Sequence, residues 1–165
     1  MGKLFRVPSS KIKLALSEFK PLEHRLEFAG QYHGIKFYND SLATIPEATI
    51  HALKVLGHDV TTLIAGGYDR GLKFAKLGTA IKNSQLKSLI LFPETGEKIW
   101  RALDKKTKSH IKKYRVPSME KAVKIAFKVT PKEKICLLSP ASASFGLFKD
   151  YEERGTLFKK LIKNK

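Results

Sequence analysis

The spacing of apolar residues changes from one segment of the chain to the next. Short apolar runs, typical of strands buried on both faces, alternate with segments whose apolar residues recur every three or four positions, as on one side of a helix. The predicted strands are VTTLIAGG, residues 88–92, a short stretch near Tyr114, and KICLLSP. The predicted helices are PEATIHALKVLG and residues 74–81, 94–103, 118–129 and about 150–162. This alternation predicts an α/β fold, a Rossmann-like doubly wound sheet that is mostly parallel.

The N-terminal part predicts a lead-in helix and a β-hairpin ahead of that sheet. A helical spacing of apolar residues runs from Ile12 to Phe19, and Pro21 ends it. RLEFAGQYH and IKFYND are typical of two extended runs, joined by a tight turn at His33-Gly34. We expect the buried positions of this hairpin to be Leu26, Phe28, Ile35 and Phe37.

Length and composition predict a single soluble domain. A chain of 165 residues with 42% hydrophobic content can bury a real core. No apolar run approaches the roughly 18 residues of a membrane span, and the N-terminus lacks the apolar stretch of a signal peptide. We therefore expect a cytoplasmic protein with no membrane partner. The single cysteine, Cys136, lies in an apolar run and is expected to fill the core.

The net charge of +17 raises the question of a polyanionic partner. Lysine supplies most of the charge, with only six arginines, and the lysines are scattered along the chain. Dedicated reading of nucleic-acid bases favours arginine, so no specific nucleic-acid partner is expected, although weak affinity for polyanions is. The densest cluster, at residues 105–113, lies in a polar stretch that predicts a solvated loop.

Three loops at the carboxyl ends of predicted strands hold the candidate chemistry. They are YNDSLAT, GGYDRG and SPASASFGLF. Ligands of open parallel sheets bind at this edge. GGYDRG has the glycine separation of a phosphate loop but continues with Leu72-Lys73 instead of lysine and a hydroxyl residue. With no GxGxxG motif either, a triphosphate must be held by another segment.

Two of these loops offer anion-binding groups. Flexible backbone around Arg70 can present its guanidinium to a carboxylate or phosphate, while a structural turn with Arg70 paired to Asp69 is the alternative. SPASASF combines hydroxyls with successive backbone N–H groups, and Ser144 is its best-placed residue. No GxSxG elbow or neighbouring histidine supports a serine hydrolase. The five histidines lack metal-ligand spacing, so no metal site is expected.

Four motifs together resemble the Mur ligases, and among them the members that add D-glutamate. HRLE at residues 24–27, YNDSLAT at 38–44, GGYDRG at 66–71 and LSPASASFGLFKDYEERG at 138–155 occur in the order that this family shows. Each motif alone is weak, but four in register are specific, and they span nearly the whole chain.

The resemblance implies a three-domain ligase of peptidoglycan synthesis. A central domain would use ATP and Mg²⁺ to convert the carboxyl of UDP-N-acetylmuramoyl-L-alanine to an acyl phosphate, which the amine of glutamate then attacks. Residues 1–22 would be a lead-in from that central domain, and residues 23–165 the C-terminal domain that brings in glutamate and closes over ATP. Closure positions the reactants, so this chain alone is expected to be inactive.

The resemblance also implies roles for single residues. Thr44 and Arg70 match positions that hold one glutamate carboxylate. Ser144, Phe145 and Tyr151 match those that hold the other. Arg25 and Asp40 match positions facing the ribose and phosphates of ATP. His24 matches a histidine near the reacting centre and is the catalytic candidate, with a hydrogen-bonded structural role as the alternative.

Two departures from the family motif leave open which enantiomer of glutamate is the substrate. Leu42 stands where a lysine is commoner, and Arg70 replaces a usual lysine, which keeps the charge but changes a point donor into a planar fork. A relative specific for L-glutamate is therefore one alternative. A stand-alone module that binds glutamate or a nucleotide is another, and a basic nucleic-acid binder is a third.

Overall fold

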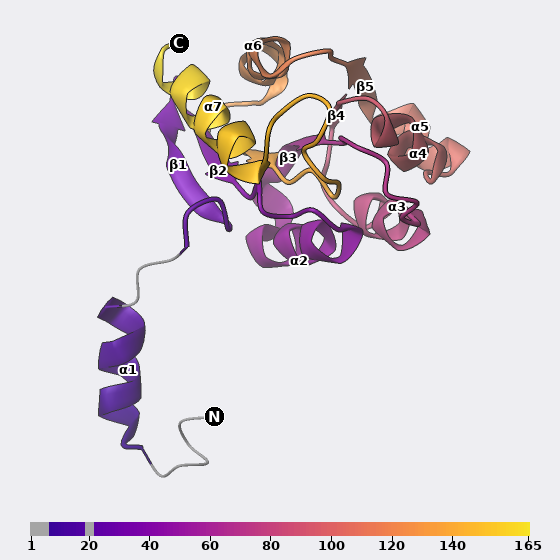
Figure 1. The fold of residues 1–165 in the computed structure, drawn as a ribbon. Helices are drawn as coiled ribbons and strands as arrows, with labels where there is room; N and C mark the ends of the chain where they lie inside the picture. The colour runs from indigo at the N-terminus through magenta and orange to yellow at the C-terminus, as the bar shows by residue number, and fades with distance from the viewer. Residues whose placement is uncertain (1–6, 19–21) are drawn as a thin grey trace.

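A six-stranded sheet forms the centre of the protein. The computed structural model describes residues 7–18 and 22–165. The strands lie in the order β1-β2-β6-β3-β4-β5, and all neighbouring pairs except β1 and β2 are parallel (Figure 1). The strands are β1 Glu27–Tyr32, β2 Ile35–Asn39, β3 Val60–Ala65, β4 Ser88–Leu91, β5 Lys112–Arg115 and β6 Ile135–Leu138.

Helices cover both faces of this sheet, as the predicted doubly wound fold requires. Apolar residues of α2, α3 and α4 pack on one face, and those of α6 and α7 pack on the other. The helices are α1 Ser9–Glu18, α2 Pro46–Leu56, α3 Ala75–Lys82, α4 Thr95–Arg101, α5 Lys105–His110, α6 Met119–Val129 and α7 Tyr151–Lys163, with a 3-10 turn η1 at Gly57–Asp59. The predicted fold class is confirmed.

The central strands are apolar throughout because both of their faces are covered. Leu63 of β3 faces the α2 and α3 side, and its neighbour Ile64 faces the α6 and α7 side. Cys136 is fully buried in the second layer, as expected of a core thiol, and burial raises its pKa strongly. The parallel strands β2, β6 and β3 end at the same edge, which brings the loops after them together.

The predicted hairpin is confirmed, but one of its buried positions is wrong. His33 and Gly34 form the two-residue turn with positive φ angles of 52° and 82°, as a primed turn requires. Phe28 is 54% exposed and Leu26 is half-buried. β1 is an edge strand with a register shift after Phe28, so this side chain packs against the ring of Tyr38 on the outer surface, with centroids 5.4 Å apart.

The lysine-rich stretch is not the solvated loop that its polarity predicts. It forms α5 and the edge strand β5, which pairs in parallel with β4. The side chain of Asp104 caps α5 by accepting a hydrogen bond from the backbone of Thr107 at 2.7 Å. Lys113 pairs with Glu97 and lies over the ring of Trp100. The strand predicted near Tyr114 is thus observed as β5, whereas local polarity concealed α5, whose Lys108 lies over Trp100 of α4.

The lead-in helix is observed as α1, from Ser9 to Glu18. Phe19 and Pro21, which the spacing predicts at its end, lie outside the described residues, as does the start of the predicted 1–22 lead-in. Leu14 of this helix is 58% exposed. In the described part of the chain, no helix combines the length and apolarity needed to cross a bilayer. The division into residues 1–22 and 23–165 stays a prediction.

Alanine at Gly66 should test how tightly the loop after β3 is packed. A Cβ at Gly66 would lie 2.5 Å from the carbonyl oxygen of Phe92, whereas a Cβ at Gly71 would meet open space, and both glycines have positive φ. We expect Gly66→Ala to lower the free energy of unfolding by about 3 kcal/mol and the matched Gly71→Ala by about 1 kcal/mol. Urea denaturation measures both, and equal losses would contradict this packing.

Candidate functional site

One small pocket gathers all five residues predicted to hold glutamate. It has a volume of about 120 Å³ and lies beside the carboxyl ends of the central strands. Its lining residues are Thr44, Arg70, Ala143, Ser144, Phe145, Asp150 and Tyr151. Residues far apart in the sequence therefore form a single concave surface that combines a cation, hydroxyl groups and aromatic rings.

The order of the strands explains this convergence. Thr44 follows β2, Arg70 follows β3, and Ser144 follows β6, which lies between those two strands. The loops after β3 and β6 are also joined directly, because the backbone N–H of Tyr68 donates to the carbonyl of Ala143 at 2.9 Å. The pocket is thus built on rigid backbone and not on free loop ends.

Arg70 has no ion pair within residues 7–18 and 22–165, so the alternative of a turn in which it pairs with Asp69 is not observed. The carboxylate of Asp69 is instead paired with Lys98, and it also accepts the backbone N–H of Gly71 at 3.0 Å. These interactions, that with Lys98 first, lower the pKa of Asp69. Its charge is satisfied on the side of α4, which leaves the exposed guanidinium of Arg70 available to a ligand.

Ser144 supplies a second polar group to the pocket lining. Its side chain is buried, with 4% exposure, and its carbonyl accepts the N–H of Phe148 at 3.1 Å. The N-terminus of α7 follows, where Asp150 already accepts the N–H of Glu153 at 2.7 Å. The cap carboxylate also lies in the pocket lining, so an anionic ligand group must keep to the Ser144 side of it.

A buried arginine, which the sequence reasoning gave no role, ties the two sides of the pocket together. Arg154 of α7 has no exposed surface. Its Nε donates to Ser41 Oγ at 3.0 Å, one terminal nitrogen to the Ser41 carbonyl at 2.8 Å, and the other to the Ser142 carbonyl at 3.1 Å. Burial lowers the pKa of Arg154 to about 9, which still leaves it charged at neutral pH. In the sequence, only its spacing of four residues from the apolar Phe158 indicated that Arg154 lies on the buried face of the C-terminal helix.

The two residues predicted to face ATP differ in their availability. Arg25 is exposed. Asp40 is 5% exposed and uses both carboxylate oxygens within the domain, accepting from Ser139 Oγ at 2.7 Å and from the N–H of Leu26 at 3.1 Å. Burial raises the pKa of Asp40. Asp40 therefore fixes the loop that carries Arg25, and Arg25 is the group of the pair that can reach an anion.

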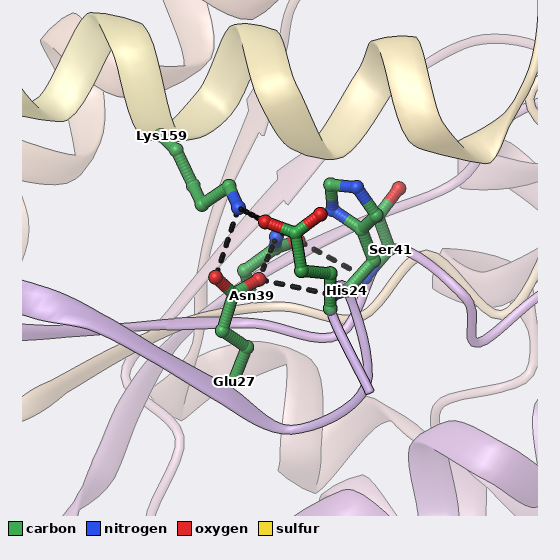
Figure 2. A network of polar contacts seen from close by, with 6 residues as sticks. His24, Glu27, Asn39, Ser41 and Lys159 are labelled. Atoms are coloured by element: carbon green, nitrogen blue, oxygen red, sulfur yellow. Dashed lines mark hydrogen bonds and ion pairs between the residues drawn. The ribbon is translucent and has the colours of Figure 1, made fainter. Parts of the chain in front are cut away.

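His24 lies under α7 in a polar network (Figure 2). Its ring is 5% exposed, and its Nδ1 lies 2.9 Å from the side-chain nitrogen of Asn39. Glu27 accepts from the His24 backbone N–H, from Asn39 and from Lys159 of α7, each at 2.9 Å. The ring also meets that of Tyr151 edge-on, with centroids 6.1 Å apart. The ring of His24 thus lies next to the pocket residue Tyr151 but does not line the pocket itself.

Comparison with known sequences decides the family. The sequence model of the family described as "Mur ligase, glutamate ligase domain" matches residues 24–142. The chain belongs to this Mur ligase family. The match begins at His24 and contains the Asn-Asp-Ser loop after β2, the Arg70 loop and the strand β6.

Similar curated members of the Mur ligase family share one description, UDP-N-acetylmuramoylalanine--D-glutamate ligase. The protein of that name from Caldanaerobacter subterraneus subsp. tengcongensis is 42% identical over 92% of this chain and 33% of its own length. Those from Acetivibrio thermocellus and Aquifex aeolicus are 39% and 38% identical, over 92% and 88% of this chain and 33% and 34% of their own lengths. The chain spans about a third of the length of the curated relatives it matches.

Solved Mur ligase structures share the fold at low identity. The MurF ligase from Thermotoga maritima, in complex with ADP, superposes over 92% of this chain and 34% of its own, with a TM-score of 0.60 at 18% identity. A ligase from Acinetobacter baumannii, described as UDP-N-acetylmuramoylalanyl-D-glutamyl-2,6-diaminopimelate--D-alanyl-D-alanyl ligase, covers 96% of this chain and 33% of its own, with a TM-score of 0.60 at 14% identity. At such identity these likenesses establish the architecture alone.

The Arg154 hydrogen bonds should stabilise the domain strongly. Arg154→Ala would leave two buried carbonyls and a hydroxyl without their donor and open a cavity, so we expect a loss of about 4 kcal/mol in the free energy of unfolding. Arg154→Lys keeps the charge but cannot reach three acceptors with one nitrogen and should lose about 2 kcal/mol. Urea denaturation measures both, and a loss below 1 kcal/mol in the alanine variant would contradict this role.

The Glu27 network predicts a defined dependence on pH. Burial raises the pKa of Glu27, but hydrogen bonds from Lys159, the His24 backbone and Asn39 outweigh it, and the pKa is lowered below 4.5. The stability it contributes is therefore present above pH 4.5 and is lost as the pH falls through the lowered pKa. We expect Glu27→Gln to cost about 1 kcal/mol at pH 7, less in acid. The exposed Glu23→Gln is the control and should cost little at either pH.

Proposed function

We propose that this domain binds the incoming glutamate for an ATP-dependent ligase that joins it to UDP-N-acetylmuramoyl-L-alanine, a step of peptidoglycan synthesis. The observation that carries the proposal is the single pocket lined by Thr44, Arg70 and Ser144, in which the guanidinium of Arg70 has no ion pair with any other described residue. The shared description of the curated relatives supports D-glutamate as the amino acid.

The polar groups that line the pocket suit the two carboxylates of glutamate. The Arg70 fork can donate two parallel hydrogen bonds to one carboxylate, with the Thr44 hydroxyl beside it. The Ser144 hydroxyl would bind the other carboxylate, and Tyr151 lines the same pocket. A monocarboxylic amino acid would leave one of these polar groups unpaired, which gives the pocket its selectivity.

The nucleotide would be bound mainly outside this chain. ATP, with Mg²⁺, supplies the phosphoryl group that activates the carboxyl of the muramoyl substrate, and a central domain holds it. In this chain, exposed Arg25 would contact its phosphates, and Asp40 would hold the Arg25 loop through Leu26. The domain then orients the glutamate amine towards the activated carboxyl when it closes on the central domain. The chain alone is accordingly without ligase activity.

Calorimetric titration of this chain with D-glutamate and L-glutamate tests the proposal. We expect saturable binding of the D enantiomer, weakened about 10- to 100-fold in Arg70→Ala and about 10-fold in Ser144→Ala, because both lose hydrogen bonds to a charged group. Arg101→Ala is the matched control, since Arg101 is an exposed arginine outside the pocket.

Either of two outcomes would count against this assignment. Equal weakening by Arg101→Ala would mean that affinity comes from general positive charge. If neither enantiomer binds, and binding stays absent after the central domain of a curated relative is added with ATP, the glutamate assignment fails. Tighter binding of L-glutamate would leave the pocket assignment in place and identify L-glutamate as the substrate.

A further inference from the structure

The His24 ring is held in one orientation by groups on three sides. Its Nδ1 lies 2.9 Å from the Asn39 side-chain nitrogen, and its edge contacts Tyr151. Helix α7 passes directly over it at Gly155, where any Cβ would collide with Nδ1. The ring is thus closely packed, and a turned ring would place a carbon in front of the Asn39 donor, so the roles of its two nitrogens are set by their neighbours.

Glu27 dictates which way the Asn39 amide points. Asn39 Nδ2 lies 2.9 Å from Glu27 Oε2, and Asn39 Oδ1 accepts the backbone N–H of Ser41 at 3.2 Å. A carboxylate can only accept hydrogen bonds, so a reversed amide would place one acceptor oxygen against another. Hydrogen bonds to Glu27 keep its pKa low, so it is ionised at neutral pH. The NH₂ group of Asn39 must therefore face both Glu27 and His24.

The same NH₂ group fixes the tautomer of His24. One of its hydrogens goes to Glu27 and the other to Nδ1 of the ring, which must then offer a lone pair. The ring proton is left on Nε2. A proton on Nδ1 would face the Asn39 donor with no acceptor between them. Among the described residues, Thr61 Oγ1 is the only fully buried side-chain polar atom that lacks a hydrogen-bond partner. Nε2 of His24 has no partner either but is not in that class, so it retains some contact with solvent.

Several charged and polar groups surround the His24 ring. Glu27 meets His24 through the backbone N–H, and its charge is neutralised by Lys159 at 2.9 Å. Lys159 also pairs with Glu23 at 3.0 Å. From α7, the neutral phenol of Tyr151 faces the ring. Two further charges stand on the flanking loops, those of Arg25 and Asp40.

We propose that Asn39, oriented by Glu27, holds His24 as the neutral Nε2–H tautomer, so that His24 offers a hydrogen-bond donor, and no proton acceptor, next to Tyr151 of the glutamate pocket. This role rests on the proposed function. In this tautomer Nε2 carries the proton, so it has no lone pair to take a proton from the glutamate amine. Asn39 is in this account a positioning residue, and another group or solvent removes the amine proton.

The tautomer can be read directly from this chain without ATP or glutamate. In a long-range ¹H–¹⁵N spectrum of the ¹⁵N-labelled protein at neutral pH, Nδ1 of His24 should show the shift of an unprotonated nitrogen and Nε2 that of a protonated one. A wild-type spectrum with the proton on Nδ1, or on both nitrogens, would overturn the proposal even if glutamate binds as expected. Conversely, absent glutamate binding would leave this spectrum unchanged.

Variants of Asn39 separate positioning from mere packing. Asn39→Asp replaces the donor with an acceptor, so Nδ1 should gain a proton and its resonance should move to the protonated range. Asn39→Ala should shift the Nδ1 resonance through loss of one hydrogen bond, a bond that biases the two tautomers by up to about tenfold. The control, Glu23→Gln, shares only Lys159 with the network and should leave both resonances in place. An Nδ1 resonance unmoved by both Asn39 variants would refute Asn39 as its partner.

Discussion

The guanidinium of Arg154 is the constraint on which the site depends. It lies between the loop after β2 and the loop after β6, and it donates to Ser41 on one side and to Ser142 on the other. Thr44 and Ser144 stand only two or three residues beyond these contacts. Because a buried charge is tolerated only when its donors are satisfied, the two loops must keep their spacing. The distance between Thr44 and Ser144 in the pocket is thereby fixed as well.

Close backbone approach completes the same arrangement. Gly155, the residue after Arg154, lets α7 rest on His24, and the Ser41 hydroxyl donates to the carbonyl of Tyr151 at 2.8 Å. The α7 N-terminus, the pocket and the His24 network are therefore held by one set of contacts. Related structures keep the architecture at 14% and 18% identity, so the fold alone does not choose a substrate. In our proposal, the side chains at these loop positions do.

Much of the fold could be predicted from local patterns, and the exceptions have a common cause. Apolar periodicity placed the central strands and the helices α2, α6 and α7, and turn chemistry placed the hairpin at His33. Phe28 was misassigned because alternation does not reveal that β1 is an edge strand with a register shift. The lysine-rich helix α5 was missed because one of its partners, the Trp100 ring next to Lys108, lies on another element.

In the candidate site too, local motifs identified some residues, while contacts between distant segments could not be predicted. Motif resemblance selected the residues that the structure brings into one pocket, but it did not reveal that Asp69 pairs with Lys98 and leaves Arg70 unpaired in the described residues. Arg154 and Asn39 stood inside quoted motifs without a role, because their partners are distant in sequence. Ser41 and Arg154, for example, are 113 positions apart. Only the folded chain shows such bonds.

The central claim is that one dicarboxylate spans this pocket, and a crystal structure of the chain with bound D-glutamate tests it most directly. The account predicts one carboxylate on the guanidinium of Arg70 with the Thr44 hydroxyl, and the other on the hydroxyl of Ser144. Glutamate bound at another edge of the sheet, or held by one carboxylate with the Ser144 hydroxyl left free, would contradict it.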